Sequence, residues 1–161
     1  MIVSNSSPII NLGKQGVLEL LEKCFKKVIL PKSVFLEIME KEESSEFKSL
    51  QKAIDEKWSI VESVEIDKAI DTKNLGQGEK EAISLAARKK CLLLIDDDNA
   101  RKYASILNLE SHGTIFVIYL SVLKGFLDKN KAKDIFENMI KDGFYVSTEV
   151  YAEFLNLLEK I

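Results

Sequence analysis

The feature that most constrains the fold of this chain is a set of short apolar runs separated by stretches with helical spacing. The clearest run, Cys91 to Ile95, has the length of a strand and is apolar at every position. Ile2-Val3 and Val28 to Leu30 are shorter runs of the same kind, and Ser59 to Val64 alternates like an edge strand. Apolar runs of this length are typical of strands buried on both faces, so they predict a mainly parallel sheet covered by helices.

The segments between these runs favour helices. Apolar residues recur at helical spacing in segments 12–21, 34–38, 47–54, 79–90, 100–107, 114–123, 134–141 and 148–160. Ser33 is expected to cap the second of these helices, a brief strand is expected near Glu110 to His112, and Phe144 to Val146 reads as a strand or turn. Regular alternation of strands and helices without a linker predicts one α/β domain over residues 1–161.

Composition narrows the function. The net charge of -3 and the pI near 5.4 disfavour a general nucleic-acid coat, although they allow an enzyme that handles nucleic acid locally. One histidine, His112, and two cysteines without metal-binding spacing, Cys24 and Cys91, disfavour zinc chemistry and histidine-based nucleophilic catalysis. No run of about 18 apolar residues and no signal-peptide pattern is present, so we expect a cytoplasmic protein that does not enter a membrane.

Polar side chains follow two of the expected strands. Asn5-Ser6 comes after the first, and Asp96-Asp97-Asp98 comes after the central apolar run. Glu37 and the pair Glu79/Glu81 lie near the starts of helices. Ligands of open parallel sheets bind beyond the carboxyl ends of the strands, so these oxygens are candidates for one site. Hard cations such as Mg²⁺ and Mn²⁺ take oxygen ligands together with water and phosphate, and they promote phosphodiester hydrolysis.

Two other interpretations compete with a metal site. Acids at helix starts also cap exposed N–H groups and complement the helix dipole, and Asp97 fits an N-cap of the helix that carries Arg101. The run LLLIDDDNAR also resembles the start of a receiver domain, but only about half of a typical domain follows it, and no second apolar strand ending in Asp does.

Five segments in order resemble a compact prokaryotic PIN-domain family related to the VapC-type toxin ribonucleases. These are VSNSSPIINL, ILPKSVFLEI, LGQGEKEAISLA, LLIDDDNAR and HGT, and they span nearly the whole chain. The resemblance implies a three-layer α/β/α sandwich, an acidic pocket that binds Mg²⁺ or Mn²⁺, and metal-dependent endoribonuclease activity. It also implies a homodimer and neutralisation by a small antitoxin protein.

The resemblance also assigns roles to residues. The four acidic positions of the family correspond to Asn5, Glu37, Glu81 and Asp97, and Asp96 is adjacent to the last of them. The resemblance implies that Glu37, Glu81 and Asp97 are the catalytic residues. Ser6 matches a hydroxyl residue that holds water beside the first acid. Glu79 belongs to the same motif without a defined role. Arg101, one turn beyond Asp97, is a candidate contact for phosphate or a partner for an acid of the pocket.

Position 5 departs from the acidic pattern, although either Asp or Asn stands there in similar proteins. An asparagine offers one neutral carbonyl oxygen, so it removes one negative charge and weakens divalent-ion binding. Two hypotheses follow. The chain is a metal-dependent ribonuclease, with RNA as its substrate, or it is a catalytically weak or inactive PIN-like protein that binds or regulates a partner.

Overall fold

The computed structural model describes residues 1–161, which form five strands and nine α-helices around one sheet. The strands are β1 (Ile2–Ser4), β2 (Val28–Pro31), β3 (Ser59–Glu62), β4 (Leu92–Leu94) and β5 (Ser111–His112). The helices are α1 (Ser6–Lys14), α2 (Glu19–Phe25), α3 (Lys32–Met39), α4 (Ser45–Asp55), α5 (Gln77–Lys89), α6 (Asp98–Ile106), α7 (Thr114–Leu123), α8 (Lys129–Lys141) and α9 (Thr148–Glu159), with a 3-10 turn, η1 (Lys68–Ile70), before α5.

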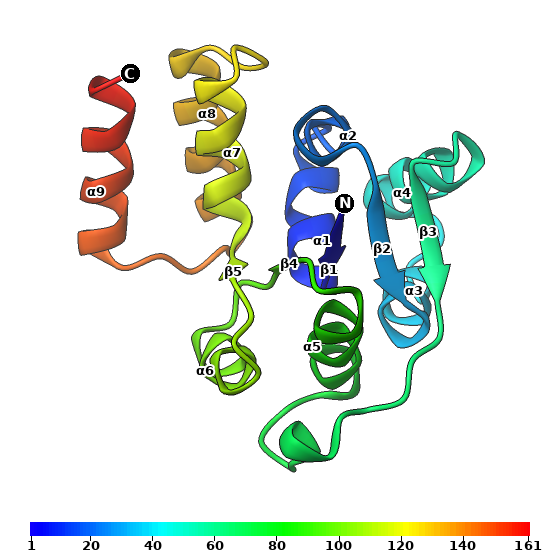
Figure 1. Ribbon diagram of the computed structural model, residues 1–161. Coiled ribbons are helices and arrows are strands. Elements are labelled where there is room, and N and C mark those ends of the chain that lie inside the picture. The colour runs from blue at the N-terminus through cyan, green and yellow to red at the C-terminus, as the bar shows by residue number, and fades with distance from the viewer.

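All strand pairs of the sheet are parallel, and the strand order is β3-β2-β1-β4-β5. Successive strands are joined through helices, as parallel strands require (Figure 1). The chain first builds outward from β1 to β3 and then returns to the other side of β1 with β4. The carboxyl ends of β1 and β4 therefore flank the point where the strand order reverses, which is where doubly wound sheets bind ligands.

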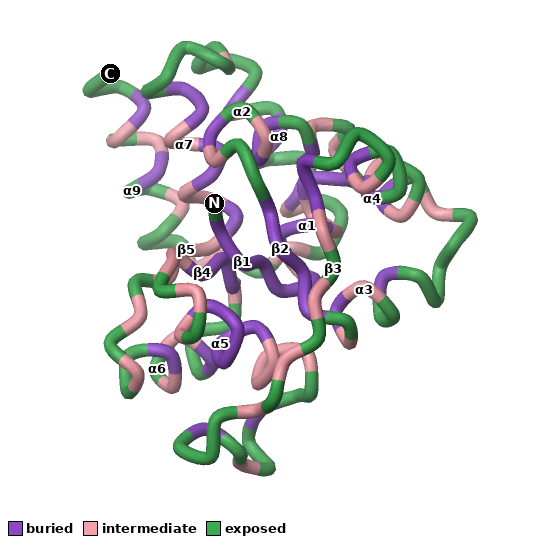
Figure 2. The backbone as a smooth tube through the Cα atoms, turned by 45° about the vertical axis from the view of Figure 1, so that its right-hand side comes forward, coloured by how far each residue is buried: buried purple, intermediate pink, exposed green.

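The inner strands β1, β2 and β4 contribute alternate residues to two separate cores, as the two-residue period of a strand requires. Ile2 and Leu30 face a large core built with α1–α4 and α7–α9, whereas Val3 and Ile29 face a smaller core built with α5, α6 and η1. The inner strands appear as buried segments in the middle of the molecule (Figure 2). The three-layer α/β/α sandwich is thereby confirmed, with most helices on one face.

Local details differ from the sequence prediction at three places. The segment 12–21 is not one helix, because the chain turns between α1 and α2 at Gly16, whose φ is +68°. Ser33 does not cap α3, because Pro31 takes the N-cap position and Ser33 lies inside the first turn. Phe144 to Val146 forms an irregular link between α8 and α9.

The cysteines and the histidine pack as ordinary structural residues. Cys24 is buried and Cys91 is half-buried, and both are free thiols. Burial raises the pKa of the Cys91 thiol, which keeps it protonated and unreactive at neutral pH. His112 stacks on Phe116 and contacts Glu110. None of the helices is both long and apolar enough to span a bilayer.

Candidate active site

Asn5 and Ser6 form the floor of a pocket at the carboxyl end of β1. The Asn5 amide N donates to the Leu94 carbonyl at 2.9 Å, which fixes this position against β4. Both side chains are only 7% exposed, and neither has a hydrogen-bond partner within the protein; Asn5 occupies the N-cap position of α1 without capping it. Buried polar groups are almost always paired. These two side chains are therefore directed at space where solvent or a ligand supplies the partner.

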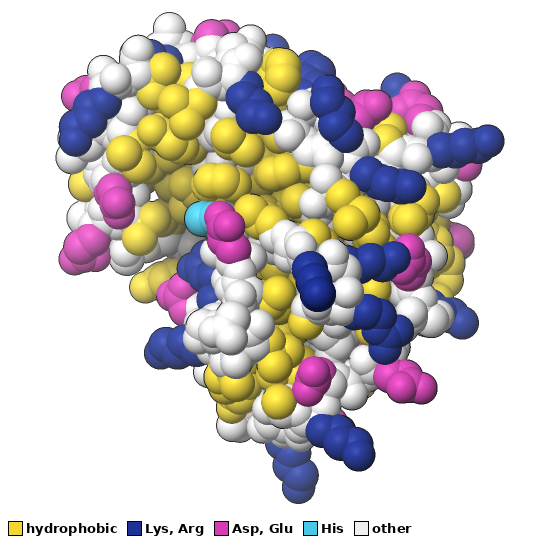
Figure 3. All heavy atoms as spheres, in the orientation of Figure 1, with side chains coloured by type: hydrophobic (Ala, Val, Ile, Leu, Met, Phe, Trp, Pro, Cys, Tyr) yellow, Lys and Arg dark blue, Asp and Glu magenta, His cyan; other side chains and the backbone are white.

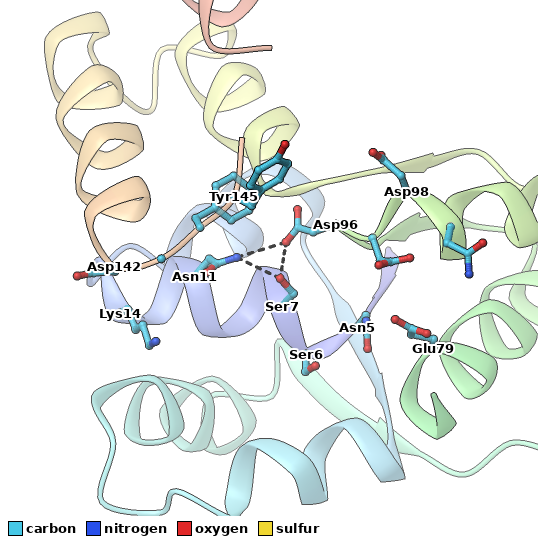
Figure 4. Close-up of a pocket in the computed structure, with 14 residues that line it drawn as sticks. Asn5, Ser6, Ser7, Asn11, Lys14, Glu79, Asp96, Asp98, Asp142 and Tyr145 are labelled. Atoms are coloured by element: carbon cyan, nitrogen blue, oxygen red, sulfur yellow. Dashed lines mark hydrogen bonds between the residues drawn. The ribbon is translucent and has the colours of Figure 1, made fainter. Parts of the chain in front are cut away.

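The pocket above this floor, called here the acidic pocket, has a volume of about 670 Å³. Its walls come from one face of α1, the start of α5, the segment 96–99 and the link 142–145 (Figure 4). A side pocket of about 390 Å³ extends from the same Asn5, Ser6 and Glu79 toward Glu37 and Glu40. The residues shared by both pockets thus lie at the centre of the site.

Glu79 contributes a carboxylate to both pockets from the first turn of α5. One of its oxygens, Oε2, accepts the amide N–H of Gly76, the N-cap residue of α5, at 2.9 Å. The other oxygen has no hydrogen-bond donor within the protein. The carboxylate lies beside the Asn5 side chain in Figure 4, so α5 delivers a negative charge to the pocket floor.

Glu37 and Asn5 approach one another beside Gly78. The Glu37 Oε2 and Asn5 Oδ1 atoms are each 3.5 Å from the position that a Cβ atom on Gly78 would occupy. The absence of a side chain at Gly78 therefore leaves both oxygens facing the same small space. This arrangement brings together two of the predicted ligands, although Glu37 lines the side pocket and not the acidic pocket.

Asp97 and Asp98 provide the exposed acids at the far wall of the acidic pocket. Asp97 is the N-cap of α6, and its Oδ1 atom accepts the Ala100 amide N–H at 2.7 Å, as the sequence predicted. Its second oxygen has no partner within the protein and can accept a ligand. Asp98 pairs with Arg101 one turn along α6.

Asp96 is fully engaged in holding the pocket walls together. Its Oδ1 atom accepts the Thr114 amide N–H at 2.6 Å, and its Oδ2 atom accepts the Thr114 and Ser7 hydroxyls at 2.7 Å each and the Asn11 amide at 3.3 Å. A carboxylate has about four acceptor sites, two on each oxygen, so these donors engage both oxygens, with three of the four bonds on Oδ2. Asp96 thereby joins the end of β4 to the first turns of α1 and α7.

Glu81, a predicted ligand, lines neither pocket. Its Oε2 atom accepts the Ser33 hydroxyl at 2.6 Å and the Ser33 amide at 3.2 Å, and its Oε1 atom accepts the Gln77 amide at 2.8 Å. The structure therefore places Glu81 at the junction of α5 with the N-terminus of α3, one turn before Glu37.

The donors of this site fit a hydrated hard cation. No three acidic, histidine or cysteine side chains converge into a ready-made metal cage. Mg²⁺ does not require one, because it keeps several waters and is usually held by one or two carboxylates together with substrate phosphates. The carboxylates of Glu79 and Asp97 and the amide oxygen of Asn5 match that donor set, and none is nitrogen or sulfur.

Positive charge near the site is sparse. Lys14, in the last turn of α1, lines the acidic pocket. Arg101 lies outside it, paired with Asp98 and with its Nη1 atom 3.2 Å from the position of a Cβ on Gly113. A Cβ on Gly113 would also lie 2.6 Å from Asp96 Oδ1, so glycine is required where Arg101 and Asp96 approach the start of α7.

Several residues of the site were missed by the sequence prediction. Ser7 and Asn11 are one turn apart on α1 and point the same way, a spacing that follows directly from the polar cluster after β1. Lys14 extends the same face of the helix. No comparable signal marked Tyr145, because it reaches the pocket from a link far along the chain.

Comparison with known proteins identifies the family and supports the fold. A family model described as "DUF3368: PIN domain" matches residues 1–160. The chain belongs to this PIN-domain family. A solved structure, "a PilT N-terminus domain protein SSO1118 from hyperthemophilic archaeon Sulfolobus solfataricus P2", is similar over 73% of this chain and 90% of that one, with a TM-score of 0.51 and 22% sequence identity. A search of curated proteins found no match.

Membership of the PIN-domain family confirms the resemblance seen in the sequence. PIN domains are typically nucleases that use divalent metal ions. The solved relative supports the fold alone, because only 22% of its sequence is identical to this PIN domain. The acidic pocket of this chain lies at the carboxyl ends of β1 and β4, where the fold places a ligand site.

Proposed function

We propose that this protein is an endoribonuclease that hydrolyses RNA phosphodiester bonds with the help of Mg²⁺ or Mn²⁺. The observation that supports this proposal most strongly is the acidic pocket itself, whose floor carries the buried and unpartnered Asn5 and Ser6 side chains and whose walls carry the carboxylates of Glu79 and Asp97. A PIN domain with polar groups held in this way has oxygen ligands for a cation and a hydroxyl group that can hydrogen-bond a phosphate.

In this proposal the ligands of the ion are Asn5, Glu79 and Asp97, with Glu37 reaching the same space beside Gly78. A divalent ion bound there would neutralise charge on the phosphoryl group and activate water for attack on phosphorus. Glu79 takes the role that the sequence assigned to Glu81. Asp96 and Glu81 act instead as positioning residues, since their carboxylate oxygens are occupied by hydrogen bonds from the protein.

Other side chains would bind and orient the substrate. The Ser6 hydroxyl is free to hydrogen-bond a water molecule or a phosphate oxygen at the pocket floor. Lys14 lies on the pocket wall, where its ammonium group can approach the backbone of a bound strand. Arg101 would contact a phosphate only by exchanging its pairing with Asp98.

Cleavage of RNA by the purified protein is expected to depend on Mn²⁺ or Mg²⁺. A mixed RNA pool incubated with protein and Mn²⁺ should be cut internally, and excess chelator should stop the reaction, because the pocket supplies too few charges of its own to activate water. Gel analysis of end-labelled RNA measures this. Cleavage that continues unchanged in chelator would contradict the metal mechanism.

A second candidate function is a PIN-like protein that binds a partner without cutting RNA. The asparagine at position 5 and the absence of a three-acid cluster favour it. This alternative predicts no binding of Mn²⁺ or Mg²⁺ at millimolar concentration by calorimetry. Robust metal-dependent cleavage would exclude it.

Changing Asn5 to aspartate is expected to tighten Mn²⁺ binding by about tenfold, since one neutral ligand becomes a charged one. Titration calorimetry of Asn5→Asp against the wild-type protein measures the change. Asn138→Asp, which adds the same charge at an exposed position of α8 that borders neither the acidic pocket nor the side pocket, is the matched control and should bind Mn²⁺ like the wild type. An unchanged affinity in Asn5→Asp would remove residue 5 from the ion's ligands.

The partners implied by the resemblance remain proposals. We propose a cytoplasmic toxin that forms a homodimer and is neutralised by a small antitoxin protein. The net charge of -3 and the sparse positive charge near the site favour a short, local contact with RNA over a long one.

A further inference from the structure

A second hollow adjoins the acidic pocket, and it has a different chemical character. This hollow, called here the aromatic groove, has a volume of about 320 Å³ and is lined half by hydrophobic residues. The lining residues used in the proposal are Arg101, His112, Phe116, Tyr145, Val146 and Val150. Asp96, Asp98 and Tyr145 border both the groove and the acidic pocket, so an extended ligand bound in one hollow can continue into the other.

Aromatic surfaces form two sides of the groove. The rings of His112 and Phe116 are stacked, with centroids 3.9 Å apart and planes inclined by 14°, and both are half-exposed. Tyr145 is 87% exposed, the highest value among the large hydrophobic side chains. Figure 3 shows hydrophobic side chains gathered over α7 and α9, with the single histidine at the edge of a hollow beside them. A tyrosine this exposed gains little from packing within its own chain.

The groove also carries polar groups, among them the carboxylates of Asp96 and Asp98 and the guanidinium of Arg101. The Arg101 guanidinium lines the groove and pairs with Asp98, and this planar group can stack on a base or contact a phosphate. Aromatic side chains and arginine are the groups on which unpaired bases stack, and stacking tolerates any base because each has a flat face. Bases within a duplex are already stacked and cannot enter, so the groove favours single-stranded RNA.

We propose that the aromatic groove binds an unpaired nucleobase adjacent to the phosphodiester held in the acidic pocket, with the base stacked on Tyr145. This inference rests on the proposed function for its substrate class, and it adds that the substrate is single-stranded at this position. Metal binding positions the phosphate, whereas the groove positions the neighbouring nucleoside. Together they define the register of the cut.

Stacking can be measured without cleavage. A short single-stranded RNA containing 2-aminopurine, added to the full chain in excess chelator, should lose fluorescence as the reporter base stacks on Tyr145. Tyr145→Ala should weaken this binding about tenfold, and Tyr145→Phe, which keeps the ring, should restore it. Phe126→Ala is the matched control, because Phe126 is also exposed but borders neither the acidic pocket nor the aromatic groove.

The outcomes separate this inference from the proposed function. Wild-type protein that quenches 2-aminopurine but never cleaves RNA with Mn²⁺ would overturn the nuclease proposal and leave the groove supported. If the wild-type protein cleaves RNA and Tyr145→Ala binds and cleaves RNA like the wild type, the proposed base binding in the aromatic groove is overturned and the nuclease proposal stands. If the wild-type protein does not quench 2-aminopurine fluorescence, the proposed base binding is also overturned. This result is expected if the groove instead receives a protein segment.

Discussion

Replacing Glu79 with glutamine is expected to lower the rate of Mn²⁺-dependent RNA cleavage at least about 100-fold, equivalent to about 2.7 kcal/mol of transition-state stabilisation. The substitution removes one charge from the pocket floor beside Asn5. Glutamine retains an oxygen that can accept the Gly76 amide N–H, so this hydrogen bond at the start of α5 and the fold should survive. A loss of activity therefore reports on the ion and not on folding. Single-turnover cleavage with Mn²⁺ in excess measures it, and circular dichroism checks the helix content.

Glu81→Gln is the matched control for that experiment. It removes the same charge from the same helix, but at a carboxylate that faces Ser33 and Gln77. We expect Glu81→Gln to retain cleavage within about tenfold of the wild type and to act mainly through stability, since a hydrogen bond to a charged acceptor contributes about 1.5–3 kcal/mol. A larger loss in Glu81→Gln than in Glu79→Gln would return the ligand role to Glu81, as the sequence alone had assigned it.

Replacing Asp96 with alanine is expected to lower the free energy of unfolding by about 3 kcal/mol. The change removes the acceptor of four hydrogen bonds and leaves the amide N–H of Thr114, a completely buried residue, without a partner. Urea denaturation followed by circular dichroism measures the loss. Asp98→Ala serves as its control, because Asp98 is exposed and its pairing with Arg101 is worth little in solvent. Equal stability of the two variants would show that the Asp96 network is not structural.

Much of the fold follows from the sequence because the physical signals are local. A run such as Cys91 to Ile95 can be buried on both faces only in the interior of a sheet, and β4 does lie between β1 and β5. The polar residues after β1 and β4 were expected to meet because parallel strands end at the same edge. The break between α1 and α2 was missed because apolar spacing continued across the turn at Gly16.

The sequence could not show which of Glu79 and Glu81 lines the acidic pocket. With 3.6 residues per turn, two residues separated by two positions project from nearly opposite sides of a helix. Their roles therefore depend on how α5 is rotated against the sheet, which long-range packing decides. Tyr145 is a similar case, since only the folded chain shows that the link after α8 passes over the segment that follows β4.

The short edges of the sheet also restrict how copies of this protein can associate. The outer strands, β3 and β5, contain four and two residues. Such edges offer few free backbone groups, so they are poor templates for the addition of a strand from another chain. The proposed homodimer is therefore expected to form through helix faces, and the folded protein should resist the edge-to-edge aggregation to which sheets with long open edges are prone.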